Sequence, residues 1–370
     1  MRIWLAPSAF FPHRGGVEEL TLQLAKRLNA SGHDTLVLTN RHPGTLAPRE
    51  THEGVEIHRV PFSAPRARPL AALRYLREQA ALQRSLDGLA APPDVLHIQC
   101  PSVQTLPLVL YARRHGVPVV LTSQGEVVMD ADHVYQRSLY MRLSLRLAAR
   151  LAAVLTACSA WTAQQCVPYA PRFAHATVIA NGVDPTQWSM ASSPQAPVLC
   201  AWGRHVQQKG FDLAIRAFAV LREQIPAARL LIGGEGAETA RLRALAGDGV
   251  EFVGAVDRAG VRDLLAGSRV AIVPSRIEPF GIVALEALAA GRGLVYAQGT
   301  GIAEAAGGLG RASDVHDPAA FAQAMQAELA DPTDPAEGRA RASALSWQRI
   351  CARYVEVYDR ARTGNAPKEA

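Results

Sequence analysis

Short apolar runs alternate along the chain with longer segments in which apolar residues recur at intervals of three and four. The short runs are typical of buried strands, and the longer spacing is typical of amphipathic helices. Such alternation predicts parallel sheets with helices on both faces. In the first half, strands are predicted at 2–6, 34–39, 55–60, 95–98, 117–122, 153–156 and 177–179, and helices at 17–29, 70–89, 103–115 and 135–150.

The second half repeats this pattern after an aperiodic segment rich in Pro, Ser and Ala, DPTQWSMASSPQAP. A chain of 370 residues exceeds the size at which one core usually stops growing, so we expect two domains. The predicted fold class is α/β, with two Rossmann-like, doubly wound domains that face each other across a cleft. The expected boundaries are 1–184 for the N-terminal domain, 185–197 for the linker, 198–345 for the C-terminal domain and 346–370 for a last helix. Within the C-terminal part, strands are predicted at 198–202, 229–232, 250–253, 270–273 and 293–297, and helices at 212–224, 238–246, 258–266, 280–290, 318–329, 336–344 and 346–360.

Two carboxylates stand in an otherwise apolar stretch, PSRIEPFGIVALEALAAG, which runs from Pro274 to Gly291. Pro279 suits the first turn of a helix, and the helical spacing begins at Phe280. Glu278 then lies at the mouth of this helix and Glu286 about two turns inside it, roughly 12 Å away along the axis. A helix N-terminus between two carboxylates offers N–H groups to an anion. This order suits a nucleotide-sugar, which has sugar hydroxyls, a diphosphate and ribose hydroxyls in line.

Two cations follow the first predicted strand of the C-terminal domain, in the pairs Gly203-Arg204 and Lys209-Gly210. A guanidinium fork and an ammonium point charge can together neutralise a diphosphate. The alternative is two surface cations in a loop. In the N-terminal domain, Gly15 and Gly16 follow the first strand and open a helix, where they either let backbone approach a phosphate or form a tight turn that needs positive φ.

Other polar residues end predicted strands. His97 ends the strand DVLHIQ and is either a core residue or a catalyst. Gln124 and Glu126 stand in TSQGE at the end of another strand, where Glu126 is a candidate acid or base. The sequence Gly233-Gly234-Glu235-Gly236 favours a turn with positive φ over a second phosphate loop.

In this order, the motifs resemble those of the retaining glycosyltransferases of family 4, glycosyl transferases group 1, which have the GT-B fold. The resemblance covers essentially the whole chain, and its most specific part is the pair of glutamates with seven residues between them. The matching segments are Gly15-Gly16, Asn181 to Asp184, Gly203-Arg204 with Lys209-Gly210, Phe252 to Gly254, Glu278 to Gly281 with Glu286, Gly299 to Glu304, and the terminal helix Trp347 to Tyr358.

The resemblance implies transfer of a sugar from a nucleotide-diphosphate-sugar, UDP- or GDP-linked, to a glycan or lipid-linked acceptor. The anomeric configuration would be retained, with no metal and no cofactor. Arg204, Lys209 and Glu278 would be catalytic, the first two holding the diphosphate and Glu278 binding the transferred sugar. The last helix would cross back to the N-terminal domain. Further donor-binding positions would be Gly15, Gly16, Gly203, Val253, Val256, Phe280, Gly281, Ile282 and Glu286.

One position departs from the family pattern. Many members have a histidine in the loop where Gln124 stands, and glutamine can donate a hydrogen bond but cannot titrate. Either the histidine does no acid–base chemistry or this protein uses its acceptor differently. His97, Gln124 and Glu126 are the acceptor-side candidates.

Charge and cysteine content refine this picture. Residues 1–180 carry 19 Lys+Arg against 12 Asp+Glu, a net +7, while residues 181–370 carry 20 against 21, a net −1. The excess is either a solvated basic surface or a site for anionic lipid or a phosphate-bearing acceptor. No nucleic-acid partner is expected, because aromatic residues are not interleaved with the arginines. Five scattered cysteines and the absence of a signal peptide or membrane span favour a cytoplasmic protein, peripheral at the inner face of the membrane if the arginines bind lipid.

Three other functions stay open. A nucleotide-sugar epimerase or hydrolase of the same architecture would form product without an acceptor. An NAD-dependent oxidoreductase would share the Rossmann-like sheets but would need a different glycine fingerprint. A non-catalytic binding module would have no need of the two leaving-group cations.

Overall fold

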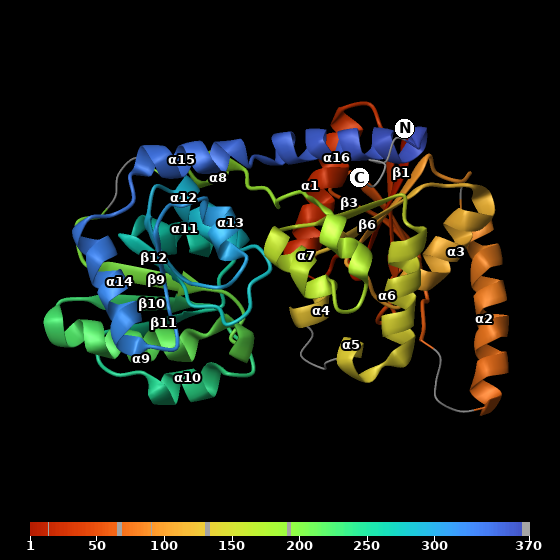
Figure 1. Cartoon of the computed structure of the whole chain (residues 1–370). Coiled ribbons are helices and arrows are strands. Elements are labelled where there is room, and N and C mark those ends of the chain that lie inside the picture. Colours follow the sequence, from red (N-terminus) through yellow and green to blue (C-terminus); the bar gives the residue numbers. More distant parts are fainter. Residues whose placement is uncertain (14, 65–68, 90, 130–133, 191–193, 365–370) are drawn as a thin grey trace. The chain divides into compact units, whose positions relative to one another are not determined.

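The protein has two compact units, seen in a computed structural model (Figure 1). The structure describes residues 1–13, 15–64, 69–89, 91–129, 134–190 and 194–364, without the side chains of 69–76. Unit 1 comprises Met1–Ile179 and Trp347–Ala370, and unit 2 comprises Ala180–Ser346. Each is a Rossmann-like α/β unit built on its own sheet, so the predicted α/β class with two Rossmann-like units is confirmed.

Unit 1 contains an eight-stranded sheet in the order β3-β4-β2-β1-β5-β6-β7-β8. All neighbours are parallel except the edge pair β3 and β4. In the central strand, Ile3 pairs with Thr35 on one side and with Val95 on the other, and it is fully buried. The strands are β1 Arg2–Pro7, β2 Asp34–Asn40, β3 Arg49–His52, β4 Val55–Val60, β5 Val95–Gln99, β6 Val119–Ser123, β7 Val154–Ala157 and β8 Thr177–Val178.

All the predicted helices of unit 1 are present, but two short helices, Glu126–Met129 and Ala160–Cys166, were not predicted, and one predicted helix is divided. The helix predicted over 135–150 is two helices, because the Ser138 side chain accepts a hydrogen bond from the N–H of Met141 and caps a new start. No helix in the described ranges is long and apolar enough to cross a bilayer. The helical elements are α1 Gly16–Ala30, α2 Pro69–Asp87, α3 Thr105–His115, α4 Glu126–Met129, α5 Val134–Arg137, α6 Leu139–Leu151, α7 Ala160–Cys166, the 3-10 helix η1 Pro171–His175, and α16 Trp347–Thr363.

The last helix, α16, belongs to unit 1 although the whole of unit 2 precedes it in sequence. It packs against α1, β5 and β6. Tyr354 and Tyr358 are fully buried there, and both rings pack against His97 of β5. The predicted return of the last helix to the N-terminal domain is therefore confirmed.

Unit 2 contains a six-stranded, all-parallel sheet in the order β11-β10-β9-β12-β13-β14. Its strands are β9 Val198–Trp202, β10 Arg229–Gly233, β11 Val250–Gly254, β12 Val270–Val273, β13 Gly293–Ala297 and β14 Arg311–Ser313. Its helices are α8 Pro185–Trp188, the 3-10 helix η2 Gln207–Lys209, α9 Phe211–Gln224, α10 Thr239–Leu245, α11 Arg258–Ala266, α12 Ile282–Ala289, α13 Ile302–Ala306, α14 Pro318–Ala330 and α15 Pro335–Ala344.

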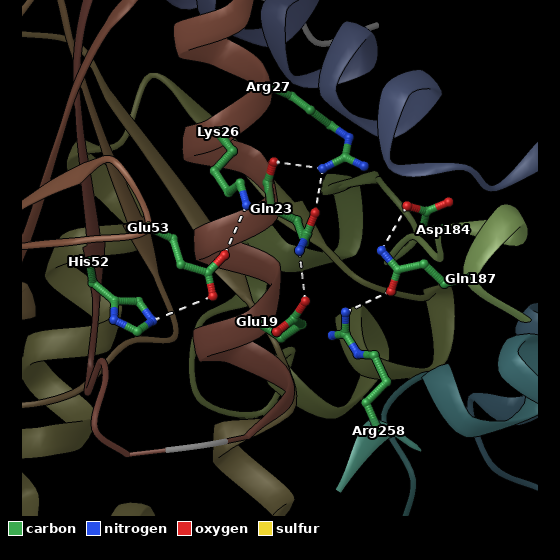
Figure 2. Close-up of polar contacts among 9 residues, drawn as sticks. All are labelled: Glu19, Gln23, Lys26, Arg27, His52, Glu53, Asp184, Gln187 and Arg258. Carbon is green, nitrogen blue, oxygen red and sulfur yellow. Dashed lines mark hydrogen bonds and ion pairs between the residues drawn. The ribbon is translucent and has the colours of Figure 1, made fainter. Parts of the chain in front are cut away.

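The predicted linker begins with an ordered element of unit 2. Asp184 caps α8, whose Trp188 is 4 % exposed, and α8 packs against α12. Figure 2 shows two further hydrogen bonds of α8. The Arg258 side chain donates to the Gln187 side chain at 2.7 Å, and the Gln187 side chain donates to Asp184 at 2.9 Å. Residues 191–193 of the predicted linker lie outside the described residues.

Candidate functional site

The loop between β12 and α12 carries the first of the two glutamates. Gly281 has a φ of 91° and is the N-cap of α12, which begins at Ile282. The prediction that the helix begins at Phe280, with Pro279 in its first turn, is wrong, because a left-handed residue cannot continue an α-helix. Glu278 therefore lies in the loop, and the separation of about 12 Å along one helix axis does not apply to the pair.

Glu278 forms an ion pair with Lys209, the last residue of η2. Lys209 Nζ donates to Glu278 Oε2 at 2.6 Å, and Ser275 Oγ donates to the same oxygen at 3.3 Å. The two charged side chains are 20 % and 10 % exposed. Residues 69 positions apart in sequence thus meet at the carboxyl ends of β9 and β12, the edge at which ligands bind in such sheets.

A second ion pair holds the same loop in place. Arg276 donates two hydrogen bonds to the carboxylate of Asp212 in α9, at 2.8 and 2.9 Å, and this guanidinium holds the pKa of Asp212 below its usual range. The backbone N–H of Arg276 donates to the carbonyl of Gln208 at 2.8 Å. A Cβ on Gly210 would lie 2.0 Å from the Pro274 carbonyl oxygen, so only glycine permits this approach. These contacts fix the position of Lys209 relative to Glu278.

The loop between β12 and α12 also contacts the turn that precedes α13. The N–H of Gly301 donates to the carbonyl of Glu278 at 2.8 Å. A Cβ on Gly301 would lie 2.0 Å from the carbonyl oxygen of Pro279. Phe280 is 2 % exposed, while Ile282 opens α12 and is partly exposed. The backbone around the first turn of α12 is therefore held on two sides.

Arg204 lies in the turn after β9, and this turn packs closely against the glycine-rich turn after β10. Gly203 N–H donates to the Gly233 carbonyl at 3.1 Å, and a Cβ on Gly234 would lie 1.9 Å from the Gly203 carbonyl oxygen. Gly234 has a φ of 115°, which confirms the interpretation of this segment as a turn with positive φ. Arg204 itself is exposed and, within the described part of the chain, pairs with no carboxylate.

The remaining donor-side candidates lie on neighbouring elements of unit 2. Glu286 lies in α12 and is partly exposed. Val253, near the end of β11, is 46 % exposed. Val256 lies just beyond that strand, and its methyl groups come within 3.1 and 3.2 Å of where a Cβ on Gly233 would be.

In unit 1, Gly15 is the N-cap of α1 with an extended φ of −169°, and Gly16 is the first helical residue. The interpretation of this pair as a turn that needs positive φ is therefore wrong. A Cβ on Gly15 would lie 2.7 Å from Oε2 of Glu18, the far end of a flexible side chain, so the fold itself does not demand glycine there. The polar face of α1 lies beyond, where Gln23 donates to Glu19 at 2.8 Å and Lys26 to Glu53 at 2.9 Å (Figure 2).

His97 is a core residue. It is fully buried, with Nδ1 2.8 Å from the Tyr358 hydroxyl and Nε2 2.6 Å from Thr122 Oγ1. Burial lowers its pKa to about 3, so it stays neutral in ordinary conditions. With both nitrogens engaged inside unit 1, His97 is not placed to contact an acceptor, and of its two predicted roles the structure supports the core one.

Gln124 and Glu126 lie at the carboxyl end of β6. The Gln124 N–H donates to Glu126 Oε2 at 2.8 Å, and Glu126 opens α4. Oε1 of Glu126 is buried. Burial raises the pKa of Glu126 to about 7, against the lowering effect of hydrogen bonds from its own and the Gln124 backbone and from Ser123 and Cys100. A carboxyl group that titrates near neutral pH is suited to acid–base or pH-sensing roles.

Sequence reasoning missed the residues that position the pair. Ser275, Arg276 and Asp212 carry no motif of their own, and only their places beside Glu278 and Lys209 mark them. Gly301 was within a segment already associated with the family, but its close approach to Pro279 is visible only in three dimensions. In the described ranges, no three His, Cys, Asp or Glu side chains gather as metal ligands.

Comparison with protein families gives two matches that together span most of the chain. Residues 15–182 match the family described as glycosyl transferase 4-like domain, and residues 196–331 match glycosyl transferases group 1. The glycogen synthase of Mycobacterium tuberculosis is 30 % identical over 388 residues, covering 95 % of this chain and 92 % of that protein. The phosphatidyl-myo-inositol mannosyltransferase of Mycolicibacterium smegmatis is 28 % identical, covering 97 % and 94 %.

Solved structures share the fold at lower identity. Sucrose-phosphate synthase from Thermosynechococcus elongatus superposes with a TM-score of 0.78 at 21 % identity, over 98 % of this chain and 100 % of that one. The Anabaena protein HepE, solved in complex with UDP and glucose, gives a TM-score of 0.74 at 18 % identity, over 97 % and 99 %.

Proposed function

Because this chain belongs to the glycosyl transferases of group 1, family 4, and has their GT-B fold, we propose that it transfers a sugar from a nucleotide-diphosphate-sugar to a glycan or lipid-linked acceptor. We further propose that transfer retains the anomeric configuration and needs neither metal nor cofactor. The observation that carries the proposal is the Lys209–Glu278 pair at the carboxyl edge of the unit 2 sheet, in front of the first turn of α12.

The pair can serve a donor that has both hydroxyls and phosphates. Lys209 and Ser275 both donate to Oε2 of Glu278. Among the described residues, Oε1 of Glu278 has no hydrogen-bond partner, so Oε1 can accept a hydrogen bond from a sugar hydroxyl. Lys209 has three N–H donors and gives one to Glu278, which leaves the others for phosphate oxygens. Arg204 is exposed between β9 and η2 and would add a planar fork for the diphosphate.

These groups fit a reaction in which negative charge develops on the leaving group. The acceptor oxygen bonds to the anomeric carbon as the bond from that carbon to the diphosphate breaks, and the acceptor proton passes to a phosphate oxygen on the same face. Fixed cations and the N–H groups of Phe280, Gly281 and Ile282 would stabilise the leaving diphosphate most in the transition state. Glu286 would hold the ribose.

Relatives guide the choice of donor and acceptor. The neighbouring structures were solved with UDP in HepE and with ADP in the starch synthase IV of Arabidopsis thaliana, and mycobacterial relatives are named as GDP-mannose-dependent. We propose a UDP- or GDP-sugar as donor. The relative named as a phosphatidyl-myo-inositol mannosyltransferase supports a lipid-linked acceptor. We propose that the protein works in the cytoplasm, at the inner face of the membrane.

A thermal-shift screen with UDP, GDP, ADP and their sugars tests the donor directly. A ligand at 100 times its Kd should stabilise the protein by about 2.7 kcal/mol. Stabilisation by the nucleotides is expected to depend on Glu286 and not on Glu278, since only the sugar would reach Glu278. Glu286→Ala should weaken binding of the bare nucleotide, and Glu278→Ala should leave it nearly unchanged. Equal losses in both variants would contradict this division.

Loss of either cation should lower turnover. Arg204→Ala and Lys209→Ala are each expected to reduce turnover by roughly 10²–10³, by analogy with removal of one oxyanion donor. Arg204 is the cleaner test, because its removal leaves no buried carboxylate unpaired, whereas Lys209→Ala strands Glu278. Arg229→Ala, which removes an exposed arginine paired with Glu251 in the same unit, is the matched control. Near-normal transfer by both Arg204→Ala and Lys209→Ala would contradict the proposed function.

Two product measurements separate this reaction from its alternatives. An epimerase or hydrolase would consume the nucleotide-sugar with no acceptor present, whereas a transferase would need one. Proton NMR of the product reports the anomeric configuration, and inversion would contradict the proposed mechanism. Turnover should be unchanged after treatment with EDTA, and loss of activity that a divalent cation restores would contradict metal independence.

A further inference from the structure

The solvent-facing side of α6 consists of leucine and arginine alone. Among the residues of Leu139–Leu151 classed as exposed, Leu139, Leu143 and Leu147 form one row, and Arg142, Arg146 and Arg150 form the next. The three leucines are 61 %, 54 % and 39 % exposed, and they are three of the five large apolar side chains that the described part of the chain exposes most. Such a face is unlike a solvated helix surface, which would carry acids or amides in place of leucine.

A hollow of about 450 Å³ continues this face toward η1. Leu143, Leu147, Ala149, Ala170 and Pro171 supply apolar lining. Arg146, Arg150 and Arg172 stand with them. Arg172 is anchored, because its Nη1 donates to the carbonyls of Ala149, Arg150 and Ala152 at 2.6, 3.1 and 3.1 Å at the end of α6. The hollow thus combines apolar walls with fixed positive charge.

The side-chain charges of the α6 arginines are not neutralised by carboxylates of the described residues. Within the described residues, none of Arg142, Arg146 and Arg150 forms an ion pair with a carboxylate. The helix itself contains no acidic residue. Residues 1–180 as a whole carry a net charge of +7. The face is therefore complementary to an extended surface that is apolar inside and anionic outside.

We propose that α6 docks unit 1 onto an anionic lipid bilayer. Leu139, Leu143 and Leu147 enter the boundary between headgroups and acyl chains, and the arginine row lies at the level of the lipid phosphates. A basic and apolar helix that lies in the plane of the interface fits this arrangement. The site does not involve the Lys209–Glu278 pair, so its failure and the failure of the proposed transfer reaction are distinguishable.

Vesicle co-sedimentation of the full chain tests the proposal. The vesicles are phosphatidylcholine alone or phosphatidylcholine with about a third phosphatidylglycerol, at low and at high salt. Binding is expected only to the anionic vesicles and should weaken at high salt, because the arginines contribute through screened charge. Each arginine lost should lower the partition coefficient about fivefold. The triple variant R142Q/R146Q/R150Q should therefore lose about 100-fold, and L139Q/L143Q/L147Q should lose at least as much.

The matched control removes the same charge elsewhere on unit 1. Arg77 and Arg84 of α2 and Arg113 of α3 are also exposed, so R77Q/R84Q/R113Q should keep most of the binding. Of the other arginines near α2, Arg66, Arg68 and Arg74 lie outside the described side chains. Equal loss in the control and in the α6 arginine variant would overturn the assignment to α6, as would unchanged binding by the leucine variant or equal binding to neutral vesicles.

Two further measurements keep the result interpretable. All six α6 positions are exposed, so each variant should keep the wild-type melting temperature and the wild-type stabilisation by nucleotide. Size-exclusion chromatography without lipid should show one oligomeric state for wild type and leucine variant. A wild-type dimer that the leucine variant abolishes would mean that a second copy covers this face, and it would overturn the proposal.

Discussion

Glu126 gives the sharpest prediction about stability, because its carboxyl group is buried at the carboxyl end of β6 and titrates far from its ordinary range. We expect Glu126→Gln to stabilise unit 1 at neutral pH. Glutamine is nearly isosteric with the protonated acid, and its side-chain oxygen can still accept the hydrogen bond from the Gln124 N–H. The substitution therefore removes the ionisation and leaves the packing in place.

The magnitude follows from the pKa. The folded-state pKa of Glu126 is about 7, and its ordinary value is 4.5. Between these values the unfolded chain has released the proton and the folded chain retains it, so the free energy of unfolding falls as pH rises. The difference of about 2.5 units, at about 1.36 kcal/mol per unit, amounts to about 3 kcal/mol of stability lost between pH 4.5 and pH 7. In Glu126→Gln this loss is absent.

The assay is urea unfolding followed by circular dichroism at half-unit steps from pH 5 to pH 8, on wild type and variant. Other titrating groups are common to both proteins, so the difference between the two curves isolates Glu126. That difference should grow by about 1.4 kcal/mol per pH unit and level off above pH 7. The control is Glu78→Gln, which removes an exposed carboxylate of α2 in the same unit and reports any general effect of losing one acid. Parallel pH curves for wild type and Glu126→Gln would refute the reasoning.

Three further predictions concern packing. Tyr358→Phe should lower the free energy of unfolding by about 1–3 kcal/mol, because it leaves the buried His97 Nδ1 without the hydroxyl that lies 2.8 Å away. Urea unfolding measures this change, and an unchanged midpoint would contradict the hydrogen bond between His97 and Tyr358. Gly301→Ala should reduce affinity for the sugar-nucleotide more than for the bare nucleotide, because the added Cβ would displace the loop that holds Glu278. Calorimetric titration with each ligand measures the two affinities, and equal losses for both ligands would contradict the prediction. Arg276→Lys should lower the melting temperature, because lysine cannot reproduce the two hydrogen bonds to Asp212. Arg229→Lys, at an exposed arginine that pairs with the exposed Glu251, should lower the melting temperature less.

The sheet interiors could be predicted from sequence with little error. The strands β9, β12 and β13 have the predicted bounds, because each is a short apolar run buried on both faces. The strand β3 was missed because its sequence, RETH, is polar and lies at an exposed edge, where no burial imposes a hydrophobic pattern. The start of α12 was misplaced because Gly281 takes a left-handed conformation that the apolar spacing around it does not reveal.

The candidate site was predictable in its residue types but not in its contacts. Lys209 and Glu278 could each be named from sequence, yet their ion pair depends on how two strand ends meet, and no local pattern records that. The same limit applies to His97, whose partner Tyr358 is 261 residues away. Sequence could place His97 at the end of a strand but could not show that a distant tyrosine occupies its second nitrogen.

The membership of α16 in unit 1 also has a consequence for the order in which the protein is made. Tyr354 and Tyr358 complete the core around His97, so unit 1 cannot finish folding until they have been synthesised. At roughly 5–20 residues per second, the 261 residues between His97 and Tyr358 take about 10–50 s to translate. Unit 2 is continuous from Ala180 to Ser346 and becomes available whole during that interval. Although domains usually fold in the order of synthesis, here the second unit can complete its fold before the first.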